Sequence, residues 1–216
     1  INDQNFEEAA SMRDAEKQAK KELEDIDGTP VLRLAFRAFI STERFSSIYV
    51  TYPADKKREM SDALKGGVID PIFVAGGSTR QESVFLGLLE MEELNPDYIL
   101  IHDGSRPWVS PALIERVLNG TIEHEACIPV VPVTEALKQI SADSSIVRHM
   151  DKKQYAAAQT PQGFRFMNIL KALKTARRDG KDYSDDAEAY HQAIGPVFSV
   201  EGEPENRKIT YRYDLR

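Results

Sequence analysis

The chain has 216 residues, of which 41% are hydrophobic and 8% aromatic, which is enough for one packed core and marginal for two. Its formal net charge of -7 argues against nucleic acid as a partner, because binding by counterion release needs a basic face. No stretch approaches the roughly 20 apolar residues of a membrane span, so no membrane partner is expected. The lone cysteine, Cys127, excludes a disulfide framework and indicates a reducing, cytoplasmic location.

The first 26 residues form an atypical, highly charged segment. Its apolar positions recur at helical spacing after Asn5 and Glu8, which together match a capping box, so an amphipathic helix is predicted over 1–26. The segment contains no predicted buried strand, and no glycine precedes Gly28.

From residue 29 onward, segments of helical period alternate with apolar or period-2 segments. This alternation predicts an α/β domain with a parallel sheet and crossover helices. Thr29 is expected to cap the first helix, Ser78 and Gln81 to form a capping box, and Gly120 to end a helix that starts at residue 110. Helices are predicted over 29–40, 56–64, 78–92, 110–120, 167–180 and 184–195, and strands over 47–52, 71–77, 97–101, 126–133 and 197–202. With no linker or repeat, we predict a single domain over 1–216.

One segment, at about 136–160, departs from the alternation. Two short alternating runs flank the turn-prone sequence Ser-Ala-Asp-Ser-Ser, which predicts a β-hairpin that projects from the domain as a β-arm. Such an arm cannot bury both of its faces alone. We therefore expect a homodimer in which a second subunit completes the arm.

Polar residues follow the predicted strand at 97–101. The carboxyl ends of strands in open α/β sheets are where ligands gather, and Asp103 lies at such an edge. Its carboxylate could hold Mg²⁺ that carries a nucleotide's phosphates, while Arg106 offers a fork for a second anion. The alternative is that Asp103 caps the turn and Arg106 pairs with a neighbouring acid.

A second site-like stretch follows the predicted strand at 71–77. Gly76 and Gly77 lead directly into a helix N-terminus, whose free amides favour an anion. Arg80 and Ser83 are about one helical turn apart and can face the same ligand. The same pattern is also common in purely structural turns, and Lys208, which follows an acidic loop, has the alternative of being a solvated surface charge.

Seven stretches, in this order, resemble motifs of the 2-C-methyl-D-erythritol 4-phosphate cytidylyltransferase family. They are GTPVLRLAF, GGSTRQESVFLGL, ILIHDGSRP, IPVVPVTEALK, QTPQGF, YSDDAEA and VEGEPENRKIT, and the likeness spans residues 20–216. The resemblance implies a Rossmann-like nucleotidyltransferase domain with a mostly parallel sheet and a homodimer with an exchanged β-arm. It also implies transfer of CMP from CTP to 2-C-methyl-D-erythritol 4-phosphate, with release of pyrophosphate.

The resemblance also implies a role for particular residues. Nucleotide contacts would fall on Gly77, Ser78, Arg80, Ser83 and Gly104, and contacts to the acceptor on Arg106, Lys152, Thr160, Ser184 and Lys208. The catalytic residues would be Lys21, Asp103 and Lys208: the two lysines would stabilise the α-phosphate and the leaving pyrophosphate, and Asp103 would place Mg²⁺. In-line attack by the acceptor's phosphate oxygen on the α-phosphorus needs no protein nucleophile.

The chain departs from the family pattern at its N-terminal segment. The family opens with a strand and a glycine-rich loop, and residues 1–28 show neither, which leaves open what replaces that strand. Lys152 stands where the family commonly has arginine, which replaces a bidentate phosphate fork by a point charge. Two alternatives follow: a cytidylyltransferase for another sugar-alcohol phosphate such as ribitol 5-phosphate, or a non-catalytic nucleotide-binding relative.

Overall fold

The computed structural model describes residues 25–66, 69–211 and 214 of the chain. It opens with a small antiparallel hairpin of β1 (Asp25–Ile26) and β2 (Thr29–Pro30). Between them, Asp27 and Gly28 have φ values of 50° and 76°, as a two-residue type I′ turn requires.

This hairpin corrects two predictions. Thr29 pairs with Ile26 in the hairpin and does not cap a helix, so α2 (Val31–Ser41) begins after Pro30. The helix predicted over 1–26 lies outside the described residues up to residue 24, and its last two residues form β1 instead.

The other elements largely follow the predicted alternation of helices and strands. They are β3 (Tyr49–Tyr52), α3 (Lys57–Leu64), β4 (Ile72–Ala75), α4 (Arg80–Glu90), β5 (Tyr98–Ile101), α5 (Pro111–His124), β6 (Ala126–Pro132), β10 (Gln162–Arg165), α6 (Phe166–Arg178), α7 (Asp186–Ala193) and β11 (Phe198–Glu201). No helix in the described part of the chain is long and apolar enough to cross a membrane.

The main sheet has the strand order β11-β6-β10-β5, with β9 (Ala156–Ala158) paired to the far end of β6. β11 is parallel to β6, whereas β10 is antiparallel to both β6 and β5, so β5, β6 and β11 all run in one direction. The predicted α/β class with a mostly parallel sheet is confirmed. The sequence analysis did not predict β10.

A second, two-stranded sheet stands beside the main one. β3 pairs in parallel with β4, and among the described residues neither strand pairs with the main sheet. No described strand connects this pair to β5, and residues 1–24, for which the sequence predicts no strand, lie outside the described part of the chain.

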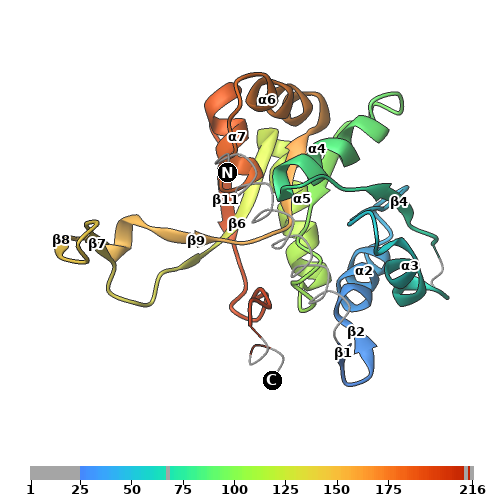
Figure 1. Ribbon diagram of the computed structural model, residues 1–216, viewed down its shortest axis with the longest axis horizontal. Coiled ribbons are helices and arrows are strands. Elements are labelled where there is room, and N and C mark those ends of the chain that lie inside the picture. The colour runs from blue at the N-terminus through green and yellow to red at the C-terminus, as the bar shows by residue number, and fades with distance from the viewer. Residues whose placement is uncertain (1–24, 67–68, 212–213, 215–216) are drawn as a thin grey trace, which may run out of the picture.

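The helices cover the sheets in separate groups, as Figure 1 shows. α4, α6 and α7 pack around Phe164 of β10, with Leu88, Leu170, Leu173 and Tyr190 in the same core cluster. α2 and α3 pack on β3, and α5 packs on α2 through a cluster centred on Phe39. The last of these clusters includes both Ile48, next to β3, and Leu100 of β5, so α2 and α5 connect the two sheets.

Two predicted helix boundaries are wrong for local reasons. At α4 the N-cap is Thr79, one residue after the predicted Ser78; its hydroxyl accepts from the Glu82 amide, while the Glu82 carboxylate accepts from the Ser78 amide at 2.8 Å. α5 does not end at Gly120 but runs to His124. A Cβ at Gly120 would lie 2.6 Å from the sulfur of Cys127, so this glycine allows α5 to approach β6 closely.

The β-arm forms where the sequence predicts it. β7 (Lys138–Ile140) and β8 (Ile146–His149) make an antiparallel hairpin, followed by the short 3₁₀ helix η1 (Lys152–Gln154) and by β9, which leads back to the body. Figure 1 shows this hairpin at the end of a long extension. All residues of β7, β8 and β9 are exposed.

The tight packing around β10 gives a test of the fold. A Cβ at Gly163 would lie 1.9 Å from the Thr121 hydroxyl oxygen of α5 and 2.7 Å from Leu100 of β5. We expect Gly163→Ala to lower the free energy of unfolding by about 1–3 kcal/mol through overpacking, as measured by urea unfolding. Gly195→Ala is the control, because nothing lies within 4 Å of its Cβ position. Equal decreases in the free energy of unfolding for the two variants would contradict the tight packing described around β10.

Candidate functional site

A cavity of about 1060 Å³ occupies the space between β3 and β5. α2 and α4 contribute to its walls, and all four residues of each of the two strands line it. Polar groups enter it from the segments that follow β4 and β5 and from the C-terminal region. All five residues predicted to bind the nucleotide line this cavity: Gly77, Ser78, Arg80, Ser83 and Gly104.

The glycine-containing loop after β4 packs tightly against the first turn of α4. The Ser83 hydroxyl accepts a hydrogen bond from the Gly77 amide at 3.1 Å and donates to the Thr79 carbonyl at 2.9 Å. A Cβ at Gly77 would lie 2.2 Å from the Glu82 side chain, so only glycine allows this approach. The loop is therefore held against a helix N-terminus, where backbone amides favour an anion.

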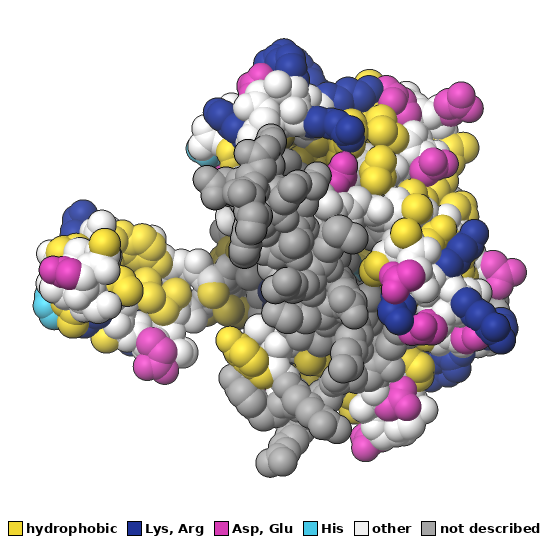
Figure 2. All heavy atoms as spheres, viewed as in Figure 1, with side chains coloured by type: hydrophobic (Ala, Val, Ile, Leu, Met, Phe, Trp, Pro, Cys, Tyr) yellow, Lys and Arg dark blue, Asp and Glu magenta, His cyan; other side chains and the backbone are white. Residues whose placement is uncertain are grey.

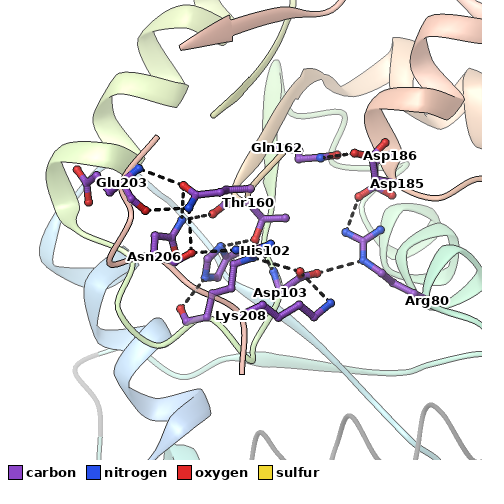
Figure 3. Close-up of polar contacts among 12 residues, drawn as sticks. Arg80, His102, Asp103, Thr160, Gln162, Asp185, Asp186, Glu203, Asn206 and Lys208 are labelled. Atoms are coloured by element: carbon purple, nitrogen blue, oxygen red, sulfur yellow. Dashed lines mark hydrogen bonds and ion pairs between the residues drawn. The ribbon is translucent and has the colours of Figure 1, made fainter. Parts of the chain in front are cut away.

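Asp103, just after β5, is surrounded by three cations (Figure 3). Its carboxylate oxygens lie 3.1 Å from Arg80 Nε, 3.1 Å from Lys208 Nζ and 3.4 Å from Arg106 Nε. Burial by itself would raise the pKa of Asp103, but the three positive charges hold this pKa well below its usual range. Asp103 is thus ionised at neutral pH, and the four side chains together carry a net positive charge.

A chain of hydrogen bonds behind Asp103 fixes its backbone. The Asp103 amide donates to the Thr160 hydroxyl at 3.0 Å, and the same hydroxyl lies 3.0 Å from His102 Nδ1. His102 Nε2 lies 3.1 Å from the Arg106 carbonyl, which fits a neutral ring protonated at Nε2. Burial lowers the pKa of His102 to about 4, so the ring is neutral at pH 7.

The remaining predicted site residues lie at different distances from the cavity. Arg106 and Thr160 support Asp103 but do not line the cavity, and Arg106 Nη1 also donates to the Asn206 carbonyl at 2.9 Å. Ser184 is exposed before α7 and donates to Glu188 at 2.6 Å. Lys152 is on the β-arm, where its ammonium donates to the Thr134 carbonyl at 2.8 Å. Lys21 lies outside the described residues.

Three buried polar residues near the site were not found by the sequence analysis. Asp186, the first residue of α7, is 1% exposed and binds Arg80, which is 106 residues away in the sequence. Gln159 and Asn206 are 5% and 0% exposed. The Gln159 side chain donates to the Asn206 carbonyl, and the Asn206 side chain donates to the Thr160 carbonyl, so these bonds join the C-terminal segment to the residues before β10. The only sequence signal was that all three lie inside the motifs quoted above.

The residues at the site fit a metal ion only when a ligand supplies most of the coordination. Among the described residues there is no group of three or more His, Cys, Asp or Glu that could hold a metal. Asp103 offers one carboxylate, and Mg²⁺ is commonly bound by one or two carboxylates together with substrate phosphates. The fold and the cavity therefore define an α/β protein with a cationic site suited to a phosphorylated ligand.

Comparison with known proteins identifies the family. The family model described as 2-C-methyl-D-erythritol 4-phosphate cytidylyltransferase (IspD) matches residues 8–216. The chain therefore belongs to this family of nucleotidyltransferases, as the sequence motifs implied.

Individual relatives agree with this assignment. A bifunctional enzyme IspD/IspF from Rhodopseudomonas palustris (strain HaA2) is 40% identical over 197 residues, which cover 90% of this chain and 49% of the relative. The chain thus spans about half the length of the curated relatives it matches. A crystal structure of 2-C-methyl-D-erythritol 4-phosphate cytidylyltransferase from Thermus thermophilus is 31% identical, with a TM-score of 0.77, over 90% of this chain and 89% of that one. The Francisella tularensis protein is 27% identical, with a TM-score of 0.78, over 90% and 89%.

The buried imidazole of His102 predicts how stability depends on pH. Below about pH 6.5 the unfolded chain takes up a proton on His102, but the folded protein does not until about pH 4. The free energy of unfolding should therefore fall by up to about 3 kcal/mol between these pH values. Urea unfolding of wild type and of His102→Asn at several pH values measures this effect. The exposed His191→Asn is the control and should keep the wild-type slope; a wild-type slope in His102→Asn would contradict the prediction.

Proposed function

We propose that the protein transfers CMP from CTP to 2-C-methyl-D-erythritol 4-phosphate and releases pyrophosphate. Family membership supports this function, and so does the convergence of the predicted nucleotide-binding residues, Asp103 and Lys208 on one cavity. Both substrates are anions, so the main task of such a site is to hold them together and to neutralise developing charge. The chain as a whole carries a net charge of -7, and a local cationic cluster is what allows it to bind an anion.

The proposed roles are those that the family motifs imply, and the cavity supports them for the residues that line it. The glycine loop, with Gly77, Ser78 and Ser83, and the nearby Gly104 bind the nucleotide, and Arg80 binds its phosphates. Lys208, together with Lys21, stabilises the α-phosphate and the departing pyrophosphate. Arg106, Thr160 and Ser184 serve the acceptor side, as does Lys208.

Mg²⁺ is the proposed cofactor, and Asp103 is the residue that would hold it together with the nucleotide's phosphates. When bound, the ion would neutralise phosphate charge and polarise the phosphoryl oxygens. Asp103 also keeps Arg80 and Lys208 close to each other at the cavity, since its Oδ1 contacts Arg80 and its Oδ2 contacts Lys208 as well as Arg106.

A homodimer formed through the β-arm is also proposed. Figure 2 shows hydrophobic side chains gathered on the arm, and four large ones are well exposed: Ile140, Ile146, Val147 and Tyr155. A projecting arm with exposed apolar side chains is typical of a segment that packs against a second copy. Lys152 lies on this arm and does not line the cavity of its own chain, so its proposed contact with the acceptor would be made in the cavity of the partner subunit.

A cytoplasmic location is proposed as well. The one cysteine, Cys127, is buried and forms no disulfide. This agrees with a reducing compartment, in which structural disulfides are rare.

Pyrophosphate release tests the proposed function. The purified chain is incubated with CTP and Mg²⁺ and with 2-C-methyl-D-erythritol 4-phosphate, ribitol 5-phosphate or no acceptor. Release that depends on 2-C-methyl-D-erythritol 4-phosphate supports the proposal. Release that depends on ribitol 5-phosphate instead would show that the proposed acceptor is wrong. No release from folded protein that still binds CTP would indicate a non-catalytic relative.

Lys208→Ala should lower kcat by about 10²–10³-fold, because it removes a positive charge aimed at the reacting phosphates. Lys171→Ala, at an exposed position of α6 that does not line the cavity, is the control for loss of a lysine and should keep wild-type kcat. Steady-state pyrophosphate release measures both variants. Equal rates for the two variants would remove Lys208 from the mechanism.

Lys152→Ala should raise the KM for the acceptor more than the KM for CTP, whereas Lys153→Ala, its exposed neighbour, should change neither. Mixing subunits then tests where Lys152 acts. When equal amounts of Lys152→Ala and Lys208→Ala chains are unfolded and refolded together, half of the dimers are mixed and have one intact site, which should give about one quarter of wild-type activity at an acceptor concentration far below the KM of Lys152→Ala. Recovery no greater than the sum of the separate variants would show that Lys152 acts in its own chain or not at all.

A further inference from the structure

Asp186 is a buried acid to which the proposed function assigns no role. It is the first residue of α7, is 1% exposed and does not line the cavity. Its Oδ2 accepts a hydrogen bond from Arg80 Nη2 at 2.7 Å, while its Oδ1 is buried with no hydrogen-bond partner in the described part of the chain. A carboxylate in this position is costly to bury, and Arg80 is the cation that compensates it.

The start of α7 is anchored to the main sheet, so the position of Asp186 is well defined (Figure 3). Gln162 of β10 donates to the Asp185 carboxylate at 2.9 Å and accepts from the Ala187 amide at 3.0 Å. Asp185 in turn caps the helix through the Glu188 amide at 2.8 Å. The residues on both sides of Asp186 are therefore tied to the sheet or to the first turn of the helix.

Arg80 is held at two of its three guanidinium nitrogens. Nε donates to Asp103 at 3.1 Å and Nη2 donates to Asp186 at 2.7 Å. The third nitrogen, Nη1, makes no hydrogen bond to a described residue, and Arg80 lines the cavity. Because the guanidinium is planar, two fixed nitrogens also fix the direction of the third.

We infer that Asp186 is a positioning residue that holds the Arg80 guanidinium in its phosphate-binding orientation. This inference rests on the proposed function, in which Arg80 binds the phosphates of CTP. A free arginine side chain loses rotamer freedom when it binds a ligand, and an anchor behind it removes part of that loss in advance. Asp186 thus contributes to nucleotide binding without touching the nucleotide.

The rival reading is that Asp186 competes with the nucleotide for Arg80. The two readings predict opposite signs. If Asp186 positions Arg80, Asp186→Asn weakens CTP binding, whereas if it competes, the same change strengthens binding. Asn keeps the size of the side chain and one acceptor oxygen, so the substitution removes mainly the charge.

The test is a double-mutant cycle on the dissociation constant of CTP with Mg²⁺, measured by calorimetry on the full chain. Asp186→Asn should raise this constant about tenfold, the equivalent of about 1.4 kcal/mol, and leave kcat within about twofold of wild type. In an Arg80→Ala background, the same change should alter the constant by less than about twofold, because its effect passes through Arg80. Asp185→Asn is the matched control: asparagine can still cap the helix but loses the oxygen that accepts from Gln162, so the Tm should fall without a change in the dissociation constant.

Each outcome decides between the readings. Equal effects of Asp186→Asn in both backgrounds would mean a general structural role, and tighter CTP binding would mean competition; either result overturns the inference. If Asp186→Asn does not fold, Arg80→Lys serves instead, because lysine lacks the planar guanidinium through which contacts to two carboxylates fix the direction of a third nitrogen, and it should weaken binding as Arg80→Ala does. Wild-type affinity in Arg80→Lys would overturn the inference. If the wild-type chain itself does not bind CTP, the proposed function fails first and the inference fails with it.

Discussion

The ion cluster around Asp103 is the interaction on which the site depends. One nearly buried carboxylate is held by Arg80 from α4, Arg106 from its own loop and Lys208 from the C-terminal segment. Three parts of the chain that are distant in sequence are thereby brought to one end of a cavity. Because the cluster has more positive than negative charge, an anionic ligand completes its charge balance. Without the carboxylate, three cations would repel one another across a few ångströms.

Uncharged hydrogen bonds set the geometry of this cluster from behind. The Gln159 side-chain amide accepts from the Glu203 backbone at 3.1 Å and donates to the Glu203 carbonyl at 2.8 Å, and Asn206 donates to the Thr160 carbonyl at 2.8 Å. These bonds fix the segment that carries Lys208 against the start of β10. Thr160 also connects to the Asp103 amide, so the same few residues position both the anion and one of its cations. Asn206 Oδ1 is buried without a hydrogen-bond partner in the described part of the chain, but the other bonds of this buried network restrain both segments, which suits a site that must hold charges at defined distances.

Residues of β3 and β5 line the same cavity as Asp103, Arg80 and Lys208. β3 and β5 each have a hydrogen-bonded neighbour on one side only among the described residues, and the space between them continues to the glycine loop and to Asp103. α4 contacts β3 and β4 of the small sheet, places Phe85 and Leu88 in the core beside β10 of the main sheet, and carries Arg80 at its first turn. The position of Arg80 relative to Asp103 therefore depends on how α4 bridges the two sheets, which makes the anchoring of Arg80 by Asp186 more important.

The sequence by itself determined the helices, most strands, the β-arm and the two polar segments at the ends of β4 and β5. Hydrophobic period reports burial along a single element, and turn residues act on their nearest neighbours, so both can be read locally. Only the tertiary structure decided that Gln162–Arg165 is a central antiparallel strand, that Gly120 lies inside a helix and that Arg80 meets Asp186. β10 has too few apolar residues to show a period, and the ion pair spans 106 residues. Pairing between distant charged groups leaves no periodic trace in a sequence, because it depends on how separately folded elements pack together.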